Sequence, residues 1–193
     1  LAMCSLAVEG ARPAGALYDA REDDALTRPK VEALGSRPAM AAWDAGLEAA
    51  WDRATDGAVW IHGDLVPGNL MVEDGSSPDV RAAPPPDATG ANEAPGAPEP
   101  TRASALPRLT GLLDWGASGV GDASLDLLPA WACLGPDARS ALLARLDATD
   151  AQVARARAYA VRKAAWGIPY YARTLPGFAA TLRWALAQVE AEA

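Results

Sequence analysis

Histidine and cysteine are scarce in this chain, and each scarcity excludes a class of site. His62 is the only histidine among 193 residues, so a catalytic zinc site built from several histidines is impossible. The two cysteines, Cys4 and Cys133, have no spacing typical of a zinc site or of a disulfide framework. They predict buried or incidental thiols in a reducing compartment, which we take to be the cytoplasm.

Long apolar runs and an excess of basic residues are also missing. No uninterrupted run of about 18 apolar residues is present, so we expect no transmembrane helix. The N-terminus lacks the basic and then apolar segments of a secretory signal. The 25 acidic and 17 basic residues give a formal net charge of −8, which argues against a nucleic-acid partner. A serine hydrolase is disfavoured as well, since no G-x-S-x-G elbow occurs.

Apolar residues make up 50% of the chain, enough for one domain with a core, and their spacing predicts a mainly helical α+β fold. Residues 1–38 are expected to form an irregular lead-in with one short helix near 28–34. Further helices are expected over residues 39–53, 122–134, 136–146, about 149–173, and from 176 onward. Gly167 and Pro169 are expected to bend or break the longest of them, over 149–173.

Short strands are expected on either side of a long, proline-rich segment. Apolar runs predict strands over residues 58–61, 69–72 and 109–113, and the last two are expected to pair as a hairpin. Between them, residues 73–108 hold eight of the sixteen prolines and no aromatic residue. Such a composition buries too little apolar surface to offset its ordering entropy, so it predicts a disordered insertion.

The first segment that carries chemistry runs from His62 to Asn69, with the sequence H-G-D-L-V-P-G-N. Gly and Pro residues predict a tight loop between two short strands. A carboxylate at Asp64 can accept the proton of an attacking hydroxyl group, and the amide oxygen of Asn69 can bind magnesium. The pair therefore indicates phosphoryl transfer, although a lone aspartate before a Pro-Gly turn is more often a turn residue.

Two further aspartates follow in a second segment, L-L-D-W-G, and a third, G-V-G-D-A-S-L-D-L. Asp114 comes at the end of an apolar strand, where a carboxylate has room for an ion beside it and can share magnesium with Asn69. Asp126 lies in an otherwise apolar helix start and must find hydrogen-bond donors, for which the backbone N–H groups of the first loop would serve. Asp122 is expected to be a helix cap rather than a ligand.

These segments resemble the aminoglycoside phosphotransferase family, a branch of the protein-kinase-like fold. The family pattern H-G-D-x-x-x-x-N, followed by I-D-W-x-x-x-G-x-G-D-P-x-x-D-L, is similar to residues 62–69 and 113–127 in order and spacing. The resemblance covers roughly residues 39–191, apart from the insertion. It implies that Asp64 is the catalytic base, that Asn69 and Asp114 bind Mg²⁺, and that His62 and Asp126 support the catalytic loop.

The resemblance is to the C-terminal lobe of such a fold alone, over residues 39–193. An N-terminal nucleotide-binding lobe needs a phosphate-covering loop and a strand lysine, and neither is recognisable in the residues before His62. The chain also begins with Leu1 rather than Met. We therefore expect a fragment or processed chain that is inactive without that lobe.

The resemblance implies an ATP-dependent O-phosphotransferase that acts on the hydroxyl group of a small molecule, with ATP as co-substrate and Mg²⁺ as cofactor. The alternative is a non-catalytic kinase-like remnant or binding module. The acceptor pocket is expected among the helices after residue 122. Acidic side chains there could bind the amines of an acceptor, although none is singled out: Asp137, Asp147, Asp150, Glu190 and Glu192.

Overall fold

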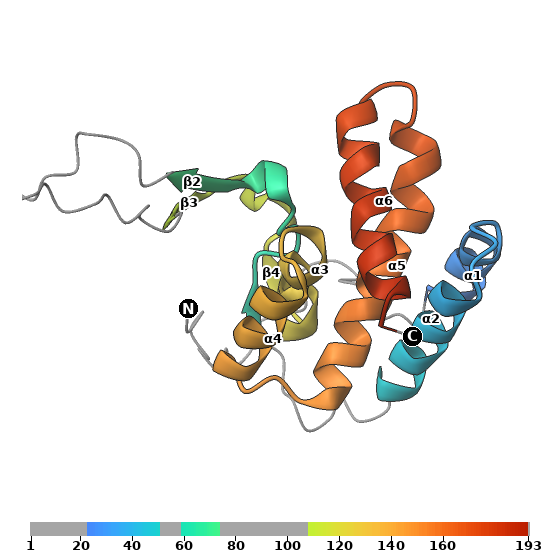
Figure 1. The fold of residues 1–193 in the computed structure, drawn as a ribbon, viewed down its shortest axis with the longest axis horizontal. Coiled ribbons are helices and arrows are strands. Elements are labelled where there is room, and N and C mark those ends of the chain that lie inside the picture. Colours follow the sequence, from blue (N-terminus) through green and yellow to red (C-terminus); the bar gives the residue numbers. More distant parts are fainter. Residues whose placement is uncertain (1–22, 51–58, 74–107, 193) are drawn as a thin grey trace, which may run out of the picture. The chain divides into compact units, whose positions relative to one another are not determined.

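The computed structural model describes residues 23–50, 59–73 and 108–192 (Figure 1). The fold is α+β and mainly helical, as the sequence predicts. It divides into two units, the first made of residues 1–69 and 114–193, and the second of residues 70–113. Cys4 and nearly all of the proposed insertion at 73–108 lie outside the described residues.

Six α-helices occur in the described part of the chain, and several match the predicted positions closely. The predicted helix near 28–34 begins and ends earlier, and the one at 39–53 begins two residues earlier. Their bounds are α1 (Asp24–Glu32), α2 (Arg37–Ala49), α3 (Pro129–Ala132), α4 (Pro136–Arg145), α5 (Asp150–Tyr171) and α6 (Pro176–Glu190).

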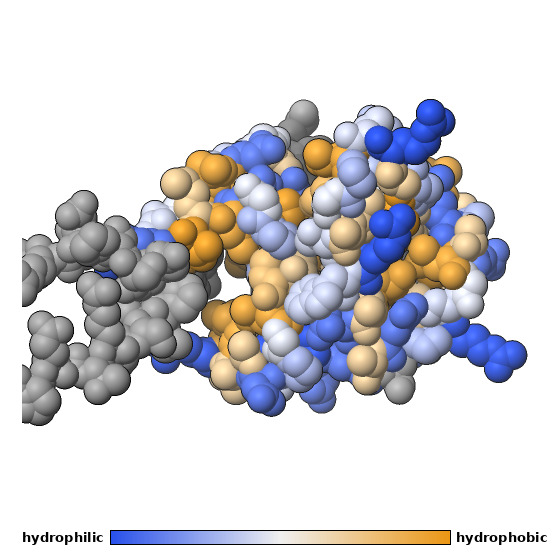
Figure 2. All heavy atoms as spheres, turned by 45° about the horizontal axis from the view of Figure 1, so that its top comes forward, coloured by the Kyte–Doolittle hydropathy of each residue, from blue (hydrophilic) through white to orange (hydrophobic). Residues whose placement is uncertain are grey.

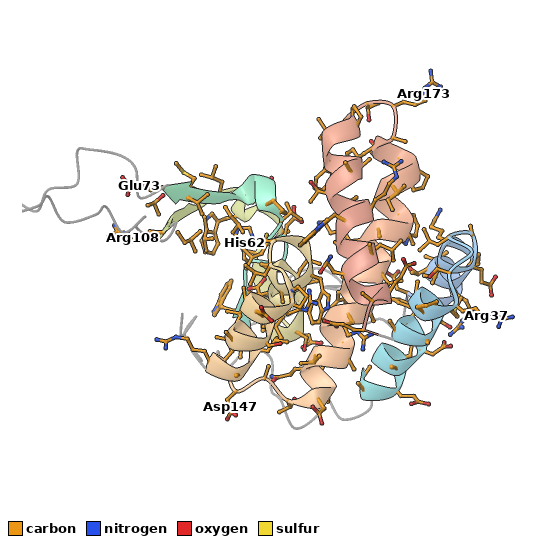
Figure 3. All side chains as sticks on the ribbon, in the orientation of Figure 1. Arg37, His62, Glu73, Arg108, Asp147 and Arg173 are labelled. Carbon is orange, nitrogen blue, oxygen red and sulfur yellow. The ribbon has the colours of Figure 1, made fainter. Side chains whose placement is uncertain are left out.

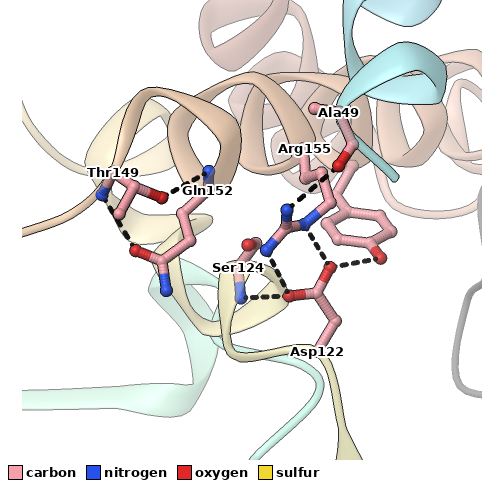
Figure 4. A network of polar contacts seen from close by, with 7 residues as sticks. Ala49, Asp122, Ser124, Thr149, Gln152 and Arg155 are labelled. Atoms are coloured by element: carbon pink, nitrogen blue, oxygen red, sulfur yellow. Dashed lines mark hydrogen bonds and ion pairs between the residues drawn. The ribbon is translucent and has the colours of Figure 1, made fainter. Parts of the chain in front are cut away.

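Helix α5 is the centre of the first unit, because it packs against α1, α2 and α6. Its N-terminus is fixed by a capping box, in which Thr149 and Gln152 each bind the other's backbone N–H (Figure 4). Alanines cover most of its buried face and allow close approach, while the fully buried Trp43 and Trp131 fill the space between helices. Burial of these large side chains is a main source of stability for the unit.

The last part of the expected lead-in is also built into this unit. The indole Nε1 of Trp43 donates to Asp24 at 2.7 Å, and the indole of Trp166 on α5 donates to Thr27 at 3.1 Å. The Lys30 Nζ lies 4.1 Å from the centroid of the Trp166 ring. Helix α1 is therefore fixed to α2 and α5 by polar contacts.

Helix α5 continues through Gly167 and Pro169, so a break at these residues is wrong. Gly167 is buried where a Cβ atom would lie 2.3 Å from Cδ1 of Leu182, so the glycine permits close packing of α5 on α6. Pro169 is exposed, and the packed face of the helix before it remains intact. Tertiary packing here outweighs the helix-breaking tendency of both residues.

The helix predicted over 122–134 is also wrong, since two short elements replace it. These are the 3₁₀ helix η4 (Ala123–Leu127) and the single turn of α3. Pro129 has no backbone N–H and cannot extend a helix that begins at 123, so a new turn starts at that proline. The η4 turn directs Asp126 towards the loop at 62–63.

Each unit contains one small antiparallel sheet. In the first unit, β1 (Val59–Ile61) pairs with β4 (Gly119–Gly121), with Ile61 opposite Gly119. In the second unit, β2 (Leu70–Glu73) pairs with β3 (Arg108–Leu112) and has a register shift between Met71 and Val72. This hairpin is confirmed, whereas β4 was not predicted. Within the described ranges, no helix is both long and apolar enough to cross a membrane.

Candidate functional site

Two backbone hydrogen bonds fix the loop that follows β1. The N–H of His62 donates to Asp126 Oδ2 at 2.7 Å, and the N–H of Gly63 donates to Asp126 Oδ1 at 2.9 Å. Burial raises the pKa of the Asp126 carboxyl, and the two N–H donors oppose that rise. A carboxylate that accepts two adjacent N–H groups holds both peptide units in one orientation.

His62 is part of this loop (labelled in Figure 3), and its side chain is held by contacts on both sides. It is fully buried, and its ring centroid lies 4.7 Å from that of Trp115, the residue after Asp114. Its Nδ1 atom accepts the backbone N–H of Asp64 at 3.3 Å. His62 thus connects the loop that carries Asp64 with the turn that carries Asp114.

Gly63 is the point of closest approach between the same two segments. Its φ is +81°, in the left-handed region that disfavours other residues, and an added Cβ atom would lie 2.5 Å from the carbonyl oxygen of Ala117. Only glycine therefore meets both the conformational and the steric demand at this position.

We expect Gly63→Ala to lower the free energy of unfolding by about 2 kcal/mol or more, since backbone strain and a backbone clash add together. Urea denaturation followed by circular dichroism measures the change. Gly68→Ala is the matched control, because nothing lies within 4 Å of a Cβ atom there, so it should change stability by only a few tenths of a kcal/mol. Equal effects of the two substitutions would contradict this account of Gly63.

Asp64 and Asn69 contact each other within the loop. The Asn69 Nδ2 group donates to the backbone oxygen of Asp64 at 2.9 Å and lies 3.4 Å from Asp64 Oδ2. Because the amide nitrogen faces Asp64, the amide oxygen of Asn69 is directed to the other side of the side chain. Asp64 also forms an ion pair with Lys163 of α5, and each of these two side chains is 30% exposed.

Asp114 lies at the start of an exposed turn. Its backbone is left-handed, with φ of 58°, and its side chain caps the 3₁₀ helix η3 (Trp115–Ala117) through the N–H of Gly116 at 3.4 Å. The next residue, Trp115, packs on the ring of His62, and Asn69 donates to Asp64 in the same loop as His62. The structure thus links each of the two proposed ligands to the loop region around His62.

The donor set fits a hard divalent cation. Mg²⁺ prefers oxygen ligands, and it usually takes only one or two from protein while phosphate and water supply the rest. Asp114 offers an exposed carboxylate, and Asn69 offers an amide oxygen. Within the residues described, no group of three or more His, Cys, Asp or Glu side chains is placed to hold a metal ion.

A buried ion pair fixes η4 against α5 (Figure 4). Asp122 Oδ2 accepts Arg155 Nε at 2.8 Å and the Tyr159 hydroxyl at 3.1 Å, and Asp122 Oδ1 accepts the N–H of Ser124 at 3.0 Å. Arg155 also donates to the carbonyl of Ala49 at the end of α2 at 3.2 Å. Asp122 is therefore both the expected cap and the centre of a structural network.

A cavity of about 310 Å³ opens beside Asp64. Its walls come from the loop after β1, η4, α5 and α6, so Asp64 lines a space large enough for a small molecule. The lining residues are mostly aromatic or aliphatic, with three charged side chains. They are Gly63, Asp64, Leu125, Leu128, Tyr159, Arg162, Lys163, Trp166, Gly167, Tyr170, Tyr171, Phe178 and Leu182.

Three polar residues of α5 belong to the site region but were not identified from the sequence. Arg155, Tyr159 and Lys163 follow one another at intervals of four residues, which places them on one face of a helix. Arg155 and Tyr159 bind Asp122, and Lys163 binds Asp64. Polar residues at this spacing in an alanine-rich helix were the signal that could have found them.

The acidic residues suggested for binding amines do not line the cavity. Glu192 instead accepts the Trp131 indole N–H at 3.0 Å and pairs with Arg139 and Arg157, so it stabilises the helices. The others lie elsewhere on the helices and their ends: Asp137, Asp147, Asp150 and Glu190. The structure thus provides no support for an acidic amine-binding site in this cavity.

A comparison with protein families gives one informative match. Residues 6–78 match the model of a phosphotransferase enzyme family, which confirms the resemblance seen in the sequence. The matched range contains the loop with His62, Asp64 and Asn69, and it begins well before residue 39, while Asp114 and Asp126 lie outside it. Comparisons with curated proteins and with solved structures gave no match.

Proposed function

We propose, from the match of residues 6–78 to a phosphotransferase family, that this protein is an ATP-dependent O-phosphotransferase for a small-molecule alcohol. In this proposal the described helical unit is the C-terminal, catalytic lobe of a kinase-like fold. The observation that carries it is the position of Asp64, on a loop held by Asp126 and at the wall of a cavity of small-molecule size.

The chemistry follows from the groups around the cavity. An acceptor hydroxyl bound beside Asp64 gives up its proton to the carboxylate as its oxygen forms a bond to the γ-phosphorus of ATP. The bond from that phosphorus to the bridging oxygen breaks, and ADP leaves with the electron pair. Asn69 positions the base through its contacts with Asp64, while His62 and Asp126 keep the loop rigid.

Asn69 and Asp114 are the residues that would hold Mg²⁺. When bound, the ion neutralises charge on the phosphate oxygens and orients the γ-phosphate. The amide oxygen and the carboxylate are hard donors, and together they leave most of the coordination shell to phosphate and water.

We expect the Asp114→Ala substitution to weaken Mg²⁺-dependent ATP binding by about tenfold or more, because one charged ligand is lost. Isothermal titration calorimetry of the full-length protein with ATP, in Mg²⁺ and in EDTA, measures this effect. Asp147→Ala is the matched control, since Asp147 has a similarly left-handed backbone, with φ of 51°, but lies outside the site. An affinity for ATP that is unchanged both by EDTA and by Asp114→Ala would contradict the proposed role of Asp114 as a Mg²⁺ ligand.

One observation favours the alternative of a non-catalytic binding module. The carboxylate of Asp64 is paired with Lys163, and a base in this state must exchange that partner for a substrate hydroxyl before it can act. A protein that binds Mg²⁺ and ATP but never transfers phosphate to an alcohol or to water would support this alternative.

A further inference from the structure

The cavity beside Asp64 differs in charge from the rest of the protein. The chain has a formal net charge of −8, yet two cationic side chains, Arg162 and Lys163, line this cavity with a single carboxylate, Asp64. Among the described lining residues no second acidic group is present to receive a cation. The lining side chains thus carry two positive charges and one negative charge, and the partner of Arg162, Asp23, is not among the lining residues.

The cations are fixed in place by neighbouring groups. Lys163 pairs with Asp64, and Arg162 pairs with Asp23 just before α1. Lys30 lies 4.1 Å from the centroid of the Trp166 ring, and Trp166 is itself a lining residue. A ligand cation that approached the Trp166 ring would meet the ammonium group of Lys30, so this ring is a poor site for a second cation.

The remainder of the cavity suits a flat apolar group. Tyr171 packs edge-to-face with both Tyr170 and Phe178, at centroid distances of 4.8 and 4.9 Å. Leu182 from α6 and Leu125 and Leu128 beside η4 provide aliphatic surface. Tyr170 and Trp166, which line the cavity, are among the large exposed hydrophobic side chains. Figure 2 shows further hydrophobic residues in several patches on one face of the molecule.

We propose that the acceptor is a hydroxyl compound with one carboxylate and an apolar or aromatic body, rather than a polyamine-like alcohol. Its carboxylate would pair with Lys163, its hydroxyl would meet Asp64 once Lys163 is released, and its body would lie against the aromatic rings. The ligand carboxylate can take the place of Asp64 as the partner of Lys163, whereas a polycation would find Asp64 as the one carboxylate of the lining. This inference rests on the proposed function, because it names the acceptor of the same site.

Three matched probes separate the effect of charge from that of the body. They are 3-phenyllactate, the neutral 3-phenylpropane-1,2-diol and the cationic phenylalaninol, all with one benzyl group. Binding to the full-length protein is measured by calorimetry without nucleotide. We expect the acid to bind about tenfold more tightly than the diol and the amine to bind most weakly, as one charge-assisted contact predicts.

Variants test whether Lys163 causes that preference. Lys163→Met should remove the tenfold preference for the acid, and Lys163→Arg should retain it. Arg173→Gln is the control, because this residue also carries a positive charge but points away from the helices (Figure 3) and does not line the cavity. Tightest binding of the amine, no measurable binding of the acid, or an unchanged preference in Lys163→Met would each overturn the inference.

The experiment also separates this inference from the proposed function. Binding of the acid without any phosphoryl transfer would support the acceptor class and refute the phosphotransferase. Transfer of phosphate to the amine, with no binding of the acid, would support the phosphotransferase and refute the acceptor class.

Discussion

The Asp64→Asn substitution is expected to lower the rate at which the γ-phosphoryl group leaves ATP by a factor of about 10² to 10⁴. An amide cannot accept the proton of the attacking hydroxyl, and a positioned general base contributes about this much to the rate. The fold should be retained, since Asp64 is only half-buried and its loop is held by the Asp126 carboxylate. Steady-state turnover of the full-length protein with Mg²⁺, ATP and an acceptor alcohol measures the effect.

Asp137→Asn provides the control for this prediction. Asp137 is an exposed carboxylate in the first turn of α4 and does not line the cavity. Its replacement should leave turnover within about twofold, because surface substitutions away from a site have small effects. If Asp64→Asn and Asp137→Asn had the same turnover, Asp64 would not be the base.

Loss of Asp122 is expected to be the most destabilising change to a charged residue near the site. In Asp122→Ala, the guanidinium of Arg155 would stay buried without its carboxylate, and both side chains are only 2% exposed. Breaking a buried pair by removal of one partner costs about 3–5 kcal/mol. Chemical denaturation should therefore show a large fall in the midpoint, and the network in Figure 4 should lose its attachment between η4 and α5.

The double variant Asp122→Ala/Arg155→Met is the matched control. It removes the charge that the single variant leaves uncompensated, so it should be more stable than Asp122→Ala alone. A single variant that loses less than about 1 kcal/mol, or a double variant that is less stable than the single one, would show that the pair does not fix η4 to α5.

Regular, periodic segments were the part of the fold that the sequence could predict. Helices α4 and α6 begin with proline at the first position, and α5 begins at the capping pair Thr149 and Gln152, so local chemistry marks their starts. The β2–β3 hairpin followed from two apolar runs. These features depend on residues near one another in the chain.

The errors came from packing between distant residues. Gly167 and Pro169 have low helix propensity, yet α5 continues because Gly167 permits contact with Leu182 on α6. The strand β4 consists of Gly119, Val120 and Gly121, and two glycines in three residues do not predict a strand. Its extended conformation comes from pairing with β1. Such pairings are not encoded in local spacing.

The residues of the candidate site also differ in whether a local motif identifies them. The loop at 62–69 and the aspartates at 114 and 126 could be identified by motif, and the structure places Asp126 on the N–H groups of His62 and Gly63. Lys163 belongs to no motif, and its contact with Asp64 spans 99 positions in the chain, so only its four-residue spacing from Arg155 and Tyr159 marks it in the sequence.

Transfer of label from [γ-³²P]ATP to a small molecule would show directly that this protein is a phosphotransferase. The full-length protein is incubated with Mg²⁺, labelled ATP and a protein-free extract of small metabolites, and the products are separated by chromatography. The account predicts a labelled organic phosphate with the wild-type protein, reduced about 100-fold or more in Asp64→Asn. Label found only in ATP and inorganic phosphate, or the same product in equal amount from Asp64→Asn, would contradict it.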